Sequence, residues 1–164
     1  DGQVPEQVDA VIRANLQRSG LFRLVEPGGA ALPENVQVNH GEWKARGADA
    51  LVVGSIARLA DGRFDVRYKL WDAVRGEELL GRSQLVVAGD LRLAAHRVAD
   101  EVYQALTGEP GVFATRIAYV LRGGRRHTLY VTDADGRSAV VEDEDYSAAS
   151  ATASAFRRSN WFWT

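Results

Sequence analysis

The sequence contains no cysteine and no methionine among its 164 residues. The absence of cysteine excludes disulfide bonds, thiolate metal sites and cysteine nucleophiles, but it leaves the cellular compartment open, because a periplasmic protein can also lack disulfides. No apolar run approaches the ~18 residues that a membrane helix needs, so we expect no membrane insertion. Neither a signal peptide nor an initiator methionine is visible, and we expect the start of the chain to be processed or truncated.

An excess of charge of one sign is also absent. The 20 basic and 22 acidic residues give a formal net charge of −2, which provides no bulk attraction to nucleic acid. The composition, 46% hydrophobic and 26% charged, is that of a globular protein. The length allows one ordinary domain with a small appendage, and we expect no nucleic-acid partner.

Residues 1–108 mix helical and strand patterns. Apolar residues at helical spacing predict a helix over 5–19 and a longer one over 90–108, with Asp90 as its N-cap and Gly108 as its C-cap. One or two further helical turns are expected in 40–48, with Trp43 facing inward. Strand patterns occupy 21–25, 50–59, 63–72 and 78–87. This order predicts an α+β fold in which two main helices pack on a small mixed sheet.

The pattern becomes purely β after the second long helix. Residues 109–113 contain Pro110-Gly111 and are predicted to be a linker. Residues 114–143 hold three short strands joined by tight turns, a β-meander that needs a partner sheet for stability. Residues 144–164 keep no steady period and are expected to form an irregular tail.

The DADG stretch at 133–136 has two interpretations. Asp133 and Asp135, with the acidic run 142–145, could supply oxygen ligands for calcium, although the spacing is not that of an EF-hand loop. A tight turn between two strands uses the same residues, because Asp caps the turn and Gly adopts a positive φ. We favour the turn and keep a cation- or ligand-binding module as the alternative function.

Other chemistry-bearing residues form no motif. His40, His96 and His127 are separated without metal-ligand spacing, so we expect them to be solvated or locally hydrogen-bonded. No serine lies in a GxSxG elbow, and no glycine-rich phosphate loop is present. We therefore predict no catalytic residue, no cofactor, no metal and no enzymatic activity.

Two places could make external or interdomain contacts. Arg122, Arg125 and Arg126 form a basic hairpin tip, which we expect to be a solvated strand end. Phe113 and Arg116 flank the linker. We expect them to pin the two domains together.

Four blocks in one colinear order resemble the TolB family. They are EWKARGADALVVGSI (42–56), DGRFDVRYKLWD (61–72), HRVADEVYQALTGEPGVFATRIAYV (96–120) and LYVTDADGRSAVV (129–141). They are similar to the amino-terminal α/β domain of that family and to the first strands of its β-propeller. The resemblance covers about residues 5–142.

The resemblance implies a non-catalytic periplasmic scaffold of the Tol–Pal system of Gram-negative bacteria, which acts through protein–protein contacts in envelope integrity and cell division. The family's propeller binds Pal, and a flexible segment at its mature amino terminus reaches TolA. On this resemblance the meander is a partial first propeller blade, and we expect this chain to lack the segments that bind Pal and TolA. A first strand is also expected to be missing, which would leave a sheet edge open to self-association.

Overall fold

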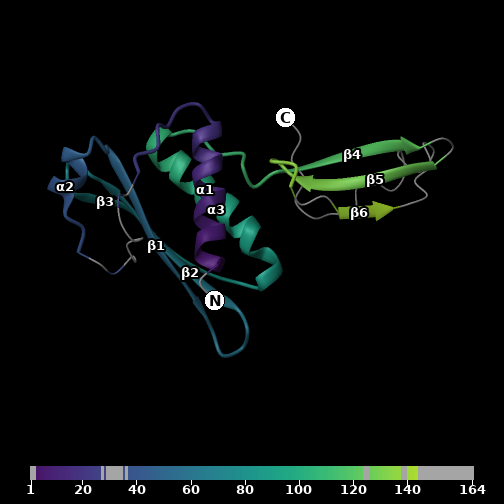
Figure 1. The fold of residues 1–164 in the computed structure, drawn as a ribbon, viewed down its shortest axis with the longest axis horizontal. Coiled ribbons are helices and arrows are strands. Elements are labelled where there is room, and N and C mark those ends of the chain that lie inside the picture. Colours follow the sequence, from purple (N-terminus) through teal and green to yellow (C-terminus); the bar gives the residue numbers. More distant parts are fainter. Residues whose placement is uncertain are drawn as a thin grey trace. The chain divides into compact units, whose positions relative to one another are not determined.

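The computed structural model in Figure 1 describes residues 3–26, 28, 35, 37–123, 126–137 and 140–143. The chain divides into two compact units, Asp1–Ala114 (unit 1) and Thr115–Thr164 (unit 2). The tail predicted for 144–164 and the side chain of Arg125 lie outside the described residues.

Unit 1 combines helices with an antiparallel sheet, which confirms the α+β class. Its helical elements are α1 (Gln3–Arg18), α2 (His40–Ala45), the short 3-10 helix η1 (Ala88–Asp90) and α3 (Leu91–Thr107). Its strands are β1 (Ala50–Arg58), β2 (Phe64–Asp72) and β3 (Glu77–Val86), in the order β1-β2-β3.

The described part of this sheet is purely antiparallel, so the prediction of a mixed sheet was wrong for these strands. Residues 59–63 and 73–76 join consecutive strands, and connections this short can only join antiparallel neighbours. The strand predicted over 21–25 is not formed either. Leu21 is exposed, and Phe22 packs edge-on against Tyr103 of α3, so this segment follows the helices rather than pairing with the sheet.

The two ends of α3 differ in how they match their sequence signals. Gly108 adopts φ +81° and its N–H donates to the Gln104 carbonyl, as predicted for a C-cap. Asp90 is the N-cap residue of α3, as predicted, although its side chain makes no capping hydrogen bond. The physical reason is η1: Asp90 already ends a 3-10 turn, in which its own N–H donates to the Val87 carbonyl.

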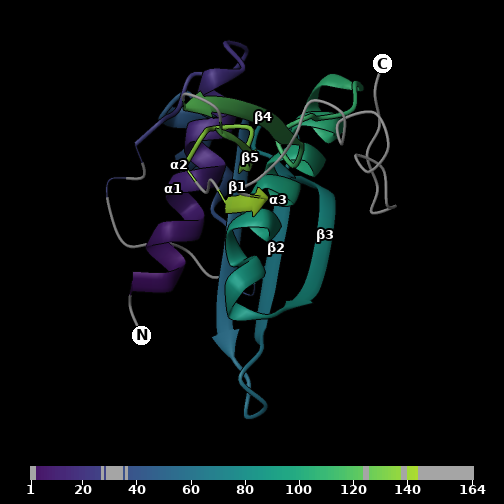
Figure 2. The ribbon, with the colours of Figure 1, turned by 90° about the vertical axis from the view of Figure 1, so that its right-hand side faces the viewer.

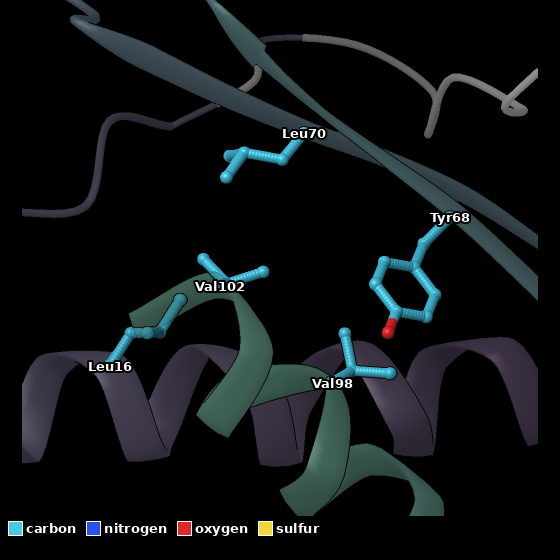
Figure 3. Close-up of a cluster of buried hydrophobic side chains, with 5 residues drawn as sticks. All are labelled: Leu16, Tyr68, Leu70, Val98 and Val102. Carbon is cyan, nitrogen blue, oxygen red and sulfur yellow. The ribbon is translucent and has the colours of Figure 1, made fainter. Parts of the chain in front are cut away.

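Helices α1 and α3 lie side by side on one face of the sheet, and the main core fills the space between these layers (Figure 2). The alternation of side chains in β2 turns Tyr68 and Leu70 toward the helices. Figure 3 shows these side chains pointing at Val98 and Val102 of α3, with Leu16 of α1 beside them. Leu70 is 0% exposed and lies at the centre of unit 1.

A second cluster covers one end of the opposite sheet face. Trp43 of α2 is buried there, as predicted, against Val53 of β1 and Ala73. Asn39 caps α2 by accepting a hydrogen bond from the Glu42 N–H. Helices α1 and α3 therefore lie on one face of the sheet of unit 1, and the second cluster covers one end of the other face.

Unit 2 contains the predicted meander. Strands β4 (Arg116–Gly123), β5 (Arg126–Asp133) and β6 (Val140–Asp143) pair antiparallel in the order β4-β5-β6. Tyr119 and Tyr130 face each other in register and their rings stack at 5.4 Å. Ile117, Val120 and Leu121 of β4 remain substantially exposed within the structure.

Candidate functional site

The DADG stretch forms a tight turn that follows β5. Gly136 has φ +77°, and its N–H donates to the Asp133 carbonyl at 2.9 Å. The Asp135 carboxylate accepts the Arg137 N–H at 3.1 Å. These bonds are the turn that we predicted, with Asp135 as its side-chain cap. A calcium-binding role for Asp133 and Asp135 stays a prediction, which calorimetric titration with calcium would check.

His96 differs most from its sequence prediction. It is 1% exposed rather than solvated, and its Nδ1 lies 2.7 Å from Nδ2 of Asn15, which is 0% exposed on α1. This buried pair joins α1 to α3, and its two residues are 81 positions apart in the sequence. The alanines of α3 were a signal in the sequence that His96 could be buried. Ala94, Ala95 and Ala99 widen the buried face of the helix beyond a single apolar stripe.

The bonding around Asn15 fixes the proton on His96. Arg18 Nη2 donates to Asn15 Oδ1 at 2.5 Å, so the amide oxygen faces the guanidinium. Asn15 Nδ2 therefore faces His96 and donates to it, which makes His96 Nδ1 an acceptor. The ring is then the neutral form that carries its proton on Nε2, and the pair links α1 to α3.

The other two histidines have separate environments. His40 lies half-buried against Trp71, with ring centroids 5.1 Å apart, and next to Gly76. His127 lies on β5, opposite Arg122 of β4 in the register. His40 is thus placed by packing against Trp71 and His127 by strand pairing. Their spacing in the sequence did not predict a shared site.

A polar network lies on the sheet face opposite α1 and α3. Ser83 of β3 donates to Asp65 Oδ1 at 2.8 Å, and Arg67 Nε donates to Asp65 Oδ2 at 2.7 Å. The Ser83 hydrogen bond and then the Arg67 contacts lower the pKa of Asp65. Ser83 thus donates to a carboxylate on the neighbouring strand and links β3 to β2.

Asp100 of α3 makes two hydrogen bonds that could not be predicted from the sequence. Its carboxylate accepts the N–H of Phe113 at 2.6 Å and the N–H of Ala114 at 3.0 Å. Burial raises the pKa of this carboxyl, and the two backbone hydrogen bonds offset that effect only in part. Sequence reasoning missed it because backbone N–H donors leave no residue-type signature.

The predicted interdomain pair is divided between the units. Phe113 belongs to unit 1, where its ring packs edge-on against Tyr103 at 5.7 Å. Arg116 begins β4 in unit 2 and is exposed. That these two residues pin the domains together remains a prediction. Separately, within the described residues no helix combines the length and hydropathy that crossing a bilayer requires.

Comparisons with known proteins agree with one another. The family model described as the TolB amino-terminal domain matches residues 1–79. The Tol-Pal system protein TolB of Polaromonas naphthalenivorans is 52% identical over 139 residues, which are 85% of this chain and 32% of that protein. The protein of the same name from Dechloromonas aromatica is 52% identical over 134 residues, 82% of this chain and 32% of the relative.

A solved structure shows the same fold. The crystal structure of TolB from Acinetobacter baumannii superposes with a TM-score of 0.72 at 36% sequence identity, and the match covers 84% of this chain and 35% of that one. The chain thus spans about a third of the length of the curated relatives that it matches.

Proposed function

The chain belongs to the TolB family, and on that premise we propose that it is a non-catalytic periplasmic scaffold of the Tol–Pal system. It acts through protein–protein contacts that support outer-membrane integrity and cell division. The observation that carries this proposal is the 52% identity over 139 residues to a Tol-Pal system protein TolB.

The proposed organisation follows the family. Residues 1–108 form a TolB-like α/β domain, 109–113 a linker that lies against this domain, 114–143 a partial first propeller blade and 144–164 an irregular tail. Pal and TolA are the proposed partners of the whole protein. Because the family's Pal-binding positions lie on the propeller, we expect residues 1–114 by themselves to bind Pal weakly or not at all.

A chimera tests the proposal. Residues 1–114 of this chain replace only the matching part of Acinetobacter baumannii TolB, which keeps its own export signal, TolA-binding amino-terminal segment and propeller. The chimera is expressed in cells that lack their own TolB. If unit 1 is a working TolB domain, the chimera restores resistance to SDS and stops the leakage of periplasmic enzymes. Its propeller still retains Pal in a pull-down.

The control separates folding from function. The same chimera carrying Leu70→Asp places a charge at a position that is 0% exposed and should fail to restore the envelope. A chimera that is exported, folded and able to bind Pal, yet leaves the envelope as leaky as the deletion strain, would show that unit 1 does not perform the proposed role.

A further inference from the structure

The segment that leaves α3 does not extend freely away from the helix. After Gly108 the chain runs back along α3, and residues 113 and 114 reach Asp100, which lies seven positions before Thr107. At about 1.5 Å of rise per residue, this return covers roughly 10 Å of helix. Residues 109–113, which the sequence suggested as a linker, are therefore folded against unit 1.

The carboxylate of Asp100 holds the far end of this segment. Its two oxygens each accept one backbone N–H, Oδ1 from Phe113 at 2.6 Å and Oδ2 from Ala114 at 3.0 Å. Hydrogen bonds to an ionised acceptor are among the stronger ones in proteins. Two bonds from consecutive amides also fix the direction of the chain, and not only its distance from the helix.

Gly111 shows how closely the segment approaches the helix. A Cβ atom built on Gly111 would lie 2.5 Å from Asp100 Cα and 2.8 Å from Asp100 Cβ. Asp100 Oδ1 would lie closer still, and Asp100 Cα is a helix backbone atom that cannot move aside. Position 111 therefore has no room for any side chain while the segment lies in this place.

The two ends of the segment are also fixed by packing and capping. The Phe113 ring contacts Tyr103, and Tyr103 contacts Phe22 at 6.0 Å, so the segment joins the main core of unit 1. At the near end, the Glu109 N–H donates to Thr107 Oγ1, which itself donates to the Tyr103 carbonyl.

We propose that Asp100 is a positioning residue that clamps residues 111–114 onto α3, so that the chain moves with unit 1 as far as Ala114. Any change of orientation between the two units then arises from Thr115 onward and not at Pro110-Gly111. The clamp goes beyond the proposed function and does not depend on it.

Amide hydrogen exchange tests the clamp in the full chain. Asp100→Asn keeps the size of the side chain but offers only one oxygen acceptor. We expect exchange at the Phe113 and Ala114 amides to become about 10- to 100-fold faster. This factor corresponds to the free energy that a hydrogen bond to a charged acceptor contributes, which the variant loses. Exchange at Leu70 in the core should stay within about twofold. Glu101→Gln, the same change at the next residue, serves as the matched control and should leave both amides protected.

A second variant keeps the test decisive if Asp100→Asn does not fold. Gly111→Ala leaves Asp100 intact and should release the same two amides, whereas Gly89→Ala, where an added Cβ meets nothing within 4 Å, should not. Because the chain has no cysteine, spin labels at Val112→Cys and Gln104→Cys report one distance between the segment and α3. That distance should be narrowly distributed in the native chain and broad in Gly111→Ala.

Two results would overturn the clamp. One is unchanged protection of the Phe113 and Ala114 amides in both variants. The other is an equal loss of protection at Leu70, which would mean that the variants open the whole unit rather than the segment.

Discussion

Replacing Leu70 by alanine is expected to destabilise unit 1 more than any exposed leucine substitution. Leu70 is 0% exposed and contacts the core cluster formed with Leu16, Tyr68, Val98 and Val102. The substitution removes three carbon atoms, worth about 2.4 kcal/mol at ~0.8 kcal/mol each. The cavity left between a sheet and two helices adds to this, so the total loss should be about 3–4 kcal/mol.

The loss converts into a shift of the melting temperature. Unit 1 spans Asp1–Ala114, and an unfolding entropy of about 2.1 cal/mol/K per residue gives roughly 0.24 kcal/mol/K for the unit. A loss of 3–4 kcal/mol therefore lowers the melting temperature by about 12–17 °C. Thermal unfolding followed by circular dichroism, with urea titration for the free energy, measures both quantities.

The neighbouring strand supplies the control. Leu85 of β3 is 52% exposed and lies on the opposite face of the sheet, so Leu85→Ala should change the free energy of unfolding by only about 0.5 kcal/mol. If Leu70→Ala costs no more than Leu85→Ala, then Leu70 is not at the centre of the core and the layer arrangement is wrong.

Three other predictions rest on single contacts. Asn15→Ala should lower the free energy of unfolding by about 1–3 kcal/mol in urea titrations, because it leaves His96 Nδ1 buried without its donor; nitrogen-15 NMR of the native chain should find the His96 proton on Nε2. The lowered pKa of Asp65 stabilises the fold above about pH 3.9, and this contribution is lost as the pH falls through the lowered value. Ser83→Ala should therefore be less stable than the native chain at pH 7, by a margin that shrinks in acid. Gly54→Ala should cost about 1–3 kcal/mol by chemical denaturation, because its Cβ would lie 2.8 Å from a β2 carbonyl oxygen.

Each of these has an outcome that contradicts it. Equal stability of Asn15→Ala and the native chain would mean that the Asn15–His96 hydrogen bond does not stabilise the packing of α1 against α3. If Ser83→Ala lowers the free energy of unfolding equally at pH 7 and in acid, the hydrogen bond from Ser83 does not stabilise the fold through the ionised form of Asp65. Gly89→Ala is the glycine control, and a loss there as large as that of Gly54→Ala would point to general helix or strand propensity.

The sequence was informative where a pattern repeats along one element. The strand pattern over 63–72 predicted β2, and the apolar spacing over 5–19 and 90–108 predicted α1 and α3. The DADG turn was predicted from turn chemistry alone, because such turns are set by the residues within them.

The sequence was uninformative where the partner is distant or is backbone. The Asn15–His96 pair joins residues whose proximity follows only from the packing of two helices. Asp100 binds amides, which every non-proline residue carries, so its partners could not be distinguished in the sequence. The mixed sheet was wrong because the strand expected at 21–25 instead lies with the helices through Phe22.

The position of Phe113 sets where unit 1 can be excised for use by itself. Cutting after Gly108, at the end of the last helix, would uncover one face of Tyr103 and leave the Asp100 carboxylate without its two amide donors. Such a truncated chain should be less soluble and less stable, although it retains every helix and strand of the unit. Cutting after Ala114 keeps these contacts, so the six residues that follow Gly108 belong with the portable module when it is grafted onto another protein.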